Sequence, residues 1–152
     1  MNMKERFELT IKNIDGMENA AELLLSKISK KEKSAFCVAL SGDLGAGKTT
    51  FSKEFAKKIG VKEVVTSPTY VLMRIYDINW QGFKKYVHID AYRLNGGPEL
   101  QKLGFDDLIS NPEHLIFIEW PERVSDVLPI DGVKLNFLHG ENENVRHLTI
   151  EI

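Results

Sequence analysis

The residues best suited to chemistry form one short stretch, Gly42-Asp-Leu-Gly-Ala-Gly-Lys-Thr49. It fits the phosphate-binding pattern G-x-x-x-x-G-K-[ST] at every fixed position. The glycines allow backbone N–H groups to approach phosphate oxygens closely. Lys48 supplies a positive charge for the β- and γ-phosphates, and the hydroxyl of Thr49 is a ligand of the kind that Mg²⁺ prefers. The stretch therefore predicts a nucleotide phosphate site.

Such a loop works only between a buried strand and a helix, and the flanking sequence predicts both. The run from Ala35 to Leu40 is apolar throughout, as in a strand that is buried on both faces. After the loop, Phe51, Phe55 and Ile59 lie on one face of a helix expected over residues 50–59, and Gly60 ends it. The alternative is a glycine-rich turn that binds nothing, and this context argues against it.

Two acidic residues follow other predicted strands. Glu119 comes directly after the apolar run Leu115–Ile118, where a carboxylate linked to Mg²⁺ is expected in such a fold. Its alternative role is a helix-start acid before Pro121. Asp90 ends the run Tyr86–Ile89 and is either a partner of the metal and its water or a surface acid paired with Arg93. The pattern alone leaves Asp90 open.

The rest of the chain alternates helical and strand patterns. Residues 7–11 read as a half-exposed strand, and residues 17–28 as a helix with Asp15 as its N-cap. Residues 71–78 and 83–89 predict an antiparallel hairpin whose turn includes Trp80. Two short helices over 98–103 and 105–109 and a final hairpin over 133–138 and 145–152 follow. We expect an α/β fold, a P-loop NTPase-like three-layer sandwich with a mixed central sheet.

Size and composition set further limits. The 152 residues predict one P-loop ATPase domain over residues 1–152. The formal net charge of −2 provides no overall basic field, so contact with nucleic acid would have to run through a partner or a local patch. The single cysteine, Cys37, lies in a predicted buried strand, where an inert thiol is expected. No apolar run is long enough for a membrane, and the expected location is cytoplasmic.

Two smaller features have competing interpretations. The hydroxyls of Ser67-Pro68-Thr69 either respond to the γ-phosphate, as switch loops do, or form local bonds in a proline turn, which the pattern favours. His88 is either a structural histidine of its strand, which the pattern favours, or a catalytic one. The chain has no N-K-x-D pattern for guanine, so we expect ATP rather than GTP.

Four blocks together resemble one family, the TsaE (formerly YjeE) ATPases of bacteria. They are Ser41–Thr50, Ser67-Pro-Thr-Tyr70, His88-Ile-Asp-Ala-Tyr-Arg-Leu94 and Ile118-Glu-Trp-Pro121. Many ATPases share the phosphate loop, whereas the combination of all four blocks in this order is specific. The family serves synthesis of the threonylcarbamoyladenosine modification of tRNA.

The resemblance implies a role for each matching residue. The backbone amides from Gly45 to Thr50, with Lys48, would hold the phosphates of ATP, and Thr49 and Glu119 would hold Mg²⁺. Asp90 would be needed for activity, and residues 67–69 would respond to the nucleotide. Ile14 would help to enclose the nucleoside. The implied set is Gly45, Ala46, Gly47, Lys48, Thr49, Thr50 and Ile14 for the nucleotide, with Lys48, Asp90 and Glu119 as catalytic residues.

The resemblance also implies partners. TsaD transfers the threonylcarbamoyl group, TsaB is its companion, and ATP hydrolysis by the TsaE member would reset the TsaD–TsaB assembly between turnovers. In that case tRNA contacts this chain only indirectly. Two other functions are compatible with a phosphate loop: a stand-alone kinase of small molecules, and a binding module that is gated by nucleotide. A kinase would need an acceptor pocket and a lid, and neither is evident in the sequence.

Overall fold

The computed structural model describes residues 5–43, 45–63 and 72–152. Its core is a seven-stranded mixed sheet in the order β1-β7-β6-β2-β5-β4-β3. The strands span Arg6–Ile11 (β1), Phe36–Gly42 (β2), Met73–Trp80 (β3), Phe83–Asp90 (β4), His114–Glu119 (β5), Val133–His139 (β6) and Arg146–Glu151 (β7). The four strands β6, β2, β5 and β4 run parallel, and antiparallel strands complete both edges.

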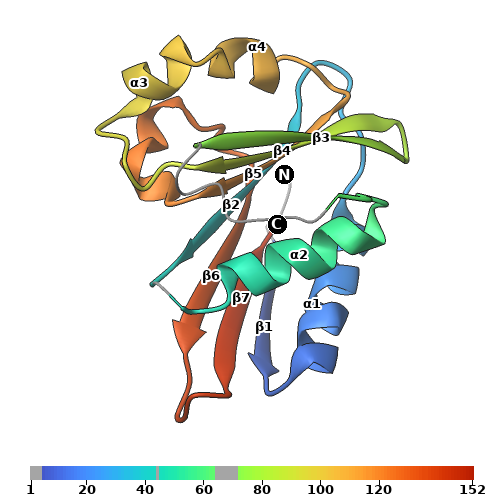
Figure 1. Cartoon of the computed structure of the whole chain (residues 1–152), viewed down its shortest axis with the longest axis vertical. Helices are drawn as coiled ribbons and strands as arrows, with labels where there is room; N and C mark the ends of the chain where they lie inside the picture. Colours follow the sequence, from blue (N-terminus) through green and yellow to red (C-terminus); the bar gives the residue numbers. More distant parts are fainter. Residues whose placement is uncertain (1–4, 44, 64–71) are drawn as a thin grey trace.

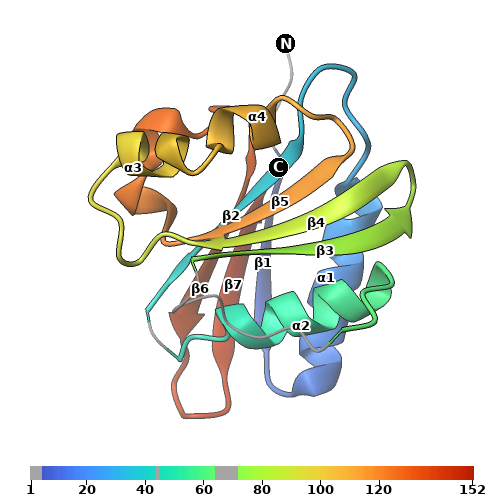
Figure 2. The same ribbon diagram turned by 45° about the horizontal axis from the view of Figure 1, so that its top comes forward.

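Helices cover the two faces of this sheet, as Figures 1 and 2 show. On one face lie α1 (Ile14–Lys27) and α2 (Lys48–Lys58). On the other lie α3 (Gly97–Lys102), α4 (Phe105–Ile109) and two 3₁₀ turns, η1 (Pro121–Arg123) and η2 (Ser125–Val127). The predicted α/β sandwich with a mixed sheet is therefore confirmed.

The central strands alternate between two apolar cores, which explains their unbroken hydrophobic sequences. Val38 of β2 and Phe117 of β5 pack with Phe51 and Phe55 of α2. Their neighbours in sequence face the opposite core, where Leu100 of α3 and Phe105 of α4 pack against residues such as Cys37, Val87, Ile116 and Ile118. Strand β6 is buried on one face only, so its sequence alternates apolar and exposed residues.

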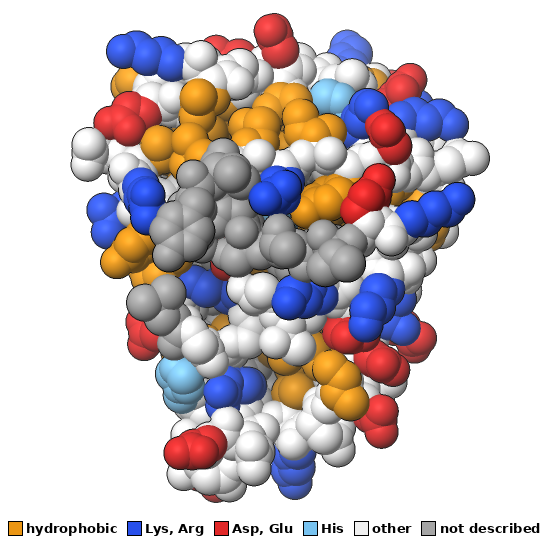
Figure 3. Space-filling view, in the orientation of Figure 1, with side chains coloured by type: hydrophobic (Ala, Val, Ile, Leu, Met, Phe, Trp, Pro, Cys, Tyr) orange, Lys and Arg blue, Asp and Glu red, His pale blue; other side chains and the backbone are white. Residues whose placement is uncertain are grey.

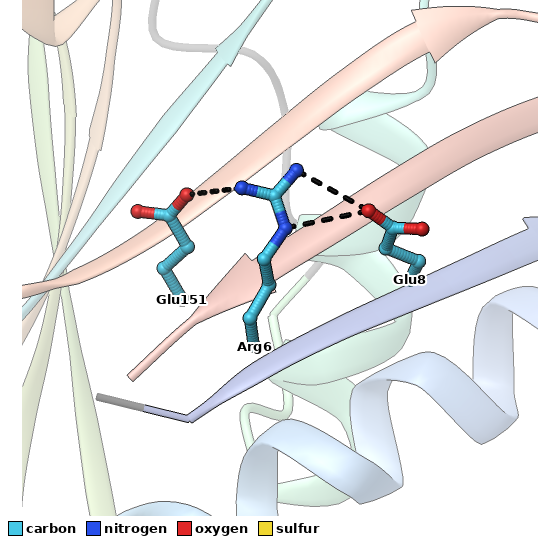
Figure 4. A network of polar contacts seen from close by, with 3 residues as sticks. All are labelled: Arg6, Glu8 and Glu151. Carbon is cyan, nitrogen blue, oxygen red and sulfur yellow. Dashed lines mark hydrogen bonds and ion pairs between the residues drawn. The ribbon is translucent and has the colours of Figure 1, made fainter. Parts of the chain in front are cut away.

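The edge formed by β1 and β7 is held by backbone pairing, and charged side chains lie along it. Arg6 stands opposite Glu151 in the register and contacts it at 3.1 Å, while it also contacts Glu8 on its own strand at 3.3 Å (Figure 4). Such exposed ion pairs contribute little stability. Positive and negative side chains are intermixed over the face seen in Figure 3, as expected from a net charge of −2.

Most predicted elements are confirmed, and two local predictions are wrong. The N-cap of α1 is Asn13 rather than Asp15, because the Asn13 side chain accepts a hydrogen bond from the N–H of Gly16 at 2.9 Å. Trp80 is the last residue of β3, where its ring stacks on Phe83, and the turn is made by Gln81 and Gly82, both with positive φ.

Candidate functional site

The strand directions bring the candidate residues to one edge of the sheet. Because β2, β4 and β5 are parallel, the loop after β2 meets the carboxyl ends of β4 and β5, which are Asp90 and Glu119. These two acids stand opposite each other in the register. Ligands of open α/β sheets bind at this kind of edge.

Two further segments reach the same edge. Strand β1 ends at Ile11, which pairs with Arg146 at the start of β7, so the first turn of α1 and the β6–β7 turn lie beside the phosphate loop. Together these segments enclose a cavity of about 470 Å³. Its volume is within the usual range for small-molecule sites. The phosphate-loop part of its wall is Gly45, Gly47, Lys48, Thr49 and Thr50, and the rest includes Ile11, Lys12, Asn13, Ile14, Met17, Asp90, Glu119, Trp120, Glu143, Asn144 and Arg146.

Two glycines of the loop are required by close contacts. Gly42 has φ 145°, and a Cβ placed there would lie 2.6 Å from the carbonyl oxygen of Phe137 on β6. Gly47 has φ 111°, and a Cβ there would lie 3.2 Å from Cε of Met17 on α1. No L side chain fits these positions comfortably. The loop is therefore packed closely on β6 at Gly42 and on α1 at Gly47, and Gly45 and Gly47 line the cavity.

Lys48 begins α2 and is only 5 % exposed. Its ammonium donates to the carbonyl of Gly42 and lies 4.0 Å from the centroid of the Trp120 ring. Burial lowers the pKa of Lys48, and the nearby carboxylates of Glu119, Glu122, Asp90 and Asp43 oppose this effect. An anion placed in the cavity would therefore stabilise the charged form of the buried Lys48 ammonium.

Asp90 and Glu119 are both buried, each 4 % exposed. Asp90 is thus not the exposed surface acid of the alternative interpretation, and it accepts a hydrogen bond from the N–H of Tyr92 at 3.0 Å. Glu119 is the last residue of its strand rather than part of a helix start, and its Oε2 lies 2.8 Å from Nε2 of His88. Both acids line the cavity with Thr49.

Trp120 follows Glu119 with φ 59° and ψ 50°, a left-handed backbone that costs a non-glycine residue about 1–2 kcal/mol. This turn directs the chain away from the sheet into η1, and the Trp120 ring contacts Lys48 on one side and Tyr92, at 5.0 Å between centroids, on another. The strained turn therefore places an aromatic ring at the phosphate loop.

The other predicted residues are found in different surroundings. Ile14 lines the cavity and is 49 % exposed, so it presents an apolar surface there. Ala46 is fully buried in the core, and its N–H donates to the carbonyl of Asp43 at 3.1 Å. Ser67, Pro68 and Thr69 lie outside the described residues.

Sequence reasoning missed the contribution of the β6–β7 turn. Glu143, Asn144 and Arg146 line the cavity, and Arg146 donates to the carbonyl of Gly45 at 3.1 Å. A polar segment between two strands looks like an ordinary solvent turn. Only the strand order, which places β7 beside β1 and β6 beside β2, reveals that this turn faces the phosphate loop.

The fold and the site define an α/β protein of the P-loop NTPase-like class. The crystal structure of Bacillus subtilis YdiB has this fold: it matches 99% of this chain and 88% of that chain, with a TM-score of 0.74 and 24% sequence identity. The sequence profile of the threonylcarbamoyl adenosine biosynthesis protein TsaE matches residues 11–148. The chain belongs to the TsaE family.

Relatives in several bacteria support this assignment. The tRNA threonylcarbamoyladenosine biosynthesis protein TsaE of Streptomyces coelicolor is 36% identical over 128 residues, which are 82% of this chain and 84% of the relative. The TsaE protein of Haemophilus influenzae is 39% identical over 116 residues, covering 76% and 69%. Among the described residues, no helix is long and apolar enough to cross a membrane.

Proposed function

We propose that this TsaE-family protein is a Mg²⁺-dependent ATPase that assists synthesis of threonylcarbamoyladenosine in tRNA. The observation that carries the proposal is the single cavity in which the phosphate loop meets two buried carboxylates, Asp90 and Glu119. A phosphate loop supplies anion binding, and carboxylates at the ends of the neighbouring strands are what metal-assisted phosphoryl transfer requires.

The cavity suggests how ATP would lie. Its phosphates would bind the backbone from Gly45 to Thr50 at the start of α2, where the helix dipole favours an anion. The nucleoside would then extend toward Ile14 and Met17 of α1, an apolar part of the wall beside the polar β6–β7 turn. Lys48 would exchange its bond to the Gly42 carbonyl for the phosphates, whose charge offsets the burial of its ammonium.

The residues present fit a magnesium ion. Mg²⁺ prefers oxygen ligands and retains several waters, so it needs few side chains from the protein. The hydroxyl of Thr49 and the carboxylate of Glu119 are the side-chain oxygens that would hold it, with Asp90 beside them. When bound, the ion would neutralise charge on the β- and γ-phosphates.

Each side chain would then have a defined part in hydrolysis. Lys48 would stabilise negative charge on the phosphates, and Asp90 would orient the attacking water or the waters of the metal. Asp90 is suited to this because the Tyr92 N–H fixes one of its oxygens inside the cavity wall. The Trp120 ring, packed on Lys48 and Tyr92, would limit the access of other water to this end of the site.

The reaction is proposed to reset a complex of TsaD and TsaB between turnovers, with tRNA bound by those partners. Family membership supports the pathway, and the net charge of −2 agrees with a chain that leaves tRNA binding to others. Hydrolysis by the chain alone is expected to be slow. Groups supplied in trans accelerate comparable enzymes by roughly 10³–10⁵-fold.

The test is phosphate release from Mg·ATP with and without TsaD and TsaB. Lys48→Ala should lower turnover by roughly 10²-fold or more, because it removes the positive charge that would stabilise the negative charge developing on the phosphates. Lys57→Ala is the matched control, since Lys57 lies on the same helix with its side chain 72 % exposed. Equal rates in the two variants would refute the site. A rate that ignores both partners but requires a metabolite would indicate a kinase instead.

A further inference from the structure

His88 is a fully buried histidine whose position gives it direct contact with the candidate metal carboxylate. It lies on β4 two residues before Asp90, so both side chains project from the same face. In the parallel register His88 stands opposite Phe117 and Asp90 opposite Glu119, which places His88 diagonally across from Glu119. Its Nε2 lies 2.8 Å from Glu119 Oε2.

The hydrogen-bond pattern of His88 defines the direction of this contact. Among the residues that the structure describes, its buried Nδ1 has no hydrogen-bond partner. A proton on Nε2 satisfies the carboxylate and leaves only a lone pair unpaired on Nδ1, whereas a proton on Nδ1 would leave a buried N–H without an acceptor. His88 therefore donates through Nε2 to Glu119.

We propose that His88 is a positioning residue that orients Glu119 for the metal of the nucleotide complex. The inference rests on the proposed function. By occupying Oε2, the imidazole leaves Oε1 as the oxygen that is available to Mg²⁺ or to a water on it. The ring itself is held in place by burial and by Tyr86, whose ring centroid is 6.1 Å away. A carboxylate fixed in this way binds a metal without first losing side-chain freedom.

A purely structural role would predict a different chemistry at this position. The neighbouring side chains on this face, Tyr86 and Phe117, are large and apolar, so an apolar residue at position 88 would fill the core. Burial of a histidine beside a glutamate costs desolvation free energy that their hydrogen bond offsets only in part, whereas an apolar residue would carry no such cost. The hydrogen bond to Glu119, next to Asp90 and the cavity, indicates that His88 serves the candidate site rather than the core.

The experiment measures Mn²⁺ affinity of the protein–ADP complex by electron paramagnetic resonance, with ADP affinity in EDTA and the melting temperature as separate readouts. Leucine has no donor, and the amide of asparagine is too short to reach Glu119. His88→Leu and His88→Asn therefore both remove the hydrogen bond. Both should weaken Mn²⁺ binding by about 10- to 100-fold while metal-free ADP affinity is retained. His88→Gln, whose amide reaches the Nε2 position, should restore most of it.

Two controls separate positioning from general damage. His114→Gln makes the same replacement at the opposite end of β5 from Glu119 and should leave Mn²⁺ affinity unchanged. In a Glu119→Ala background, His88→Asn should cause no further loss, because its partner is already absent. Unchanged Mn²⁺ affinity in His88→Asn, or an additive loss with Glu119→Ala, would overturn the inference. Failure of the wild-type protein to bind ADP would instead refute the proposed function.

Discussion

Arg146, the first residue of β7, donates through Nη2 to the carbonyl oxygen of Gly45 in the phosphate loop, 101 positions earlier in the chain. The same guanidinium donates to the carbonyls of Glu143, at 2.6 Å, and Val145, at 3.0 Å. One side chain therefore ties the β6–β7 turn to the loop that would bind phosphate. Two walls of the cavity are fixed relative to each other by this contact.

Arg146→Ala should weaken ADP binding by about 5- to 10-fold. A hydrogen bond to a charged group contributes about 1.5–3 kcal/mol. Without it the phosphate loop would be less ordered before binding, and part of this free energy would be lost from the affinity for ADP. Isothermal titration calorimetry measures the effect. Arg6→Ala is the matched control, because Arg6 lies at the other end of the β1–β7 pair and its ion pairs are exposed. Equal affinities of the two variants would show that the tie is unimportant for binding.

Asp90→Asn should reduce the turnover number by about 10- to 100-fold and change ATP affinity by less than about threefold. The substitution keeps the size of the side chain and its ability to accept from Tyr92 N–H, and it removes the charge that would orient water. Calorimetric ATP binding and phosphate release at saturating ATP give the two quantities. Lost binding with an unchanged turnover number would contradict this role for Asp90.

Asn13→Ala should destabilise the protein by about 0.5–2 kcal/mol, because Gly16 N–H loses its acceptor at the start of α1. Urea denaturation measures the change in the free energy of unfolding. Asn13→Asp should retain most of the stability, since its carboxylate can accept the same bond. Asp15→Ala provides the comparison: if it cost as much as Asn13→Ala, the assignment of the cap to Asn13 would be wrong.

Cys37 should not react with a thiol reagent such as DTNB at pH 8 while the protein is folded. The side chain is 4 % exposed, and burial raises the pKa of the Cys37 thiol from 9.0 to about 12. Reaction should begin only on unfolding in urea, so its rate reports the opening of the sheet. Rapid labelling of the native protein would disprove the burial of β2 at this position.

The same shift predicts a trend of stability with pH. Since the folded-state pKa of Cys37 lies above the unfolded value, the unfolded chain loses its proton first as pH rises. The contribution of Cys37 is fully present below pH 9 and declines from there toward pH 12. A Cys37→Ala variant should therefore lose stability less steeply between pH 9 and 11 than the wild-type protein does.

Short-range sequence patterns were sufficient to predict much of the fold and of the site. The strand, loop and helix around Lys48 are specified by residues next to one another, as are the apolar runs of β2 and β5, which are buried on both faces. The positions of Asp90 and Glu119 followed because parallel strands end at the same edge. These features depend on short-range patterns and on one general property of α/β sheets.

The features that were not predicted depend mainly on contacts between distant segments of the chain. No property of the sequence around Arg146 indicates that it lies on Gly45, because the strand order decides this. The contact of His88 with Glu119 likewise requires the register of β4 on β5. The cap at Asn13 was missed for a different reason: Asn13 and Asp15 both suit an N-cap, and their spacing does not choose between them.

The central place of β2 has a consequence for synthesis on the ribosome. Val38 of β2 pairs with Val133 of β6, about 95 positions later, and Gly42 packs on Phe137 of the same strand. Until β6 emerges, one edge of β2 has no partner and the phosphate loop lacks the neighbour that shapes it. An exposed apolar edge of this kind pairs readily with other chains. Nascent chains halted before β6 should accordingly depend on chaperones and fail to retain nucleotide, however complete their Gly42–Thr49 motif.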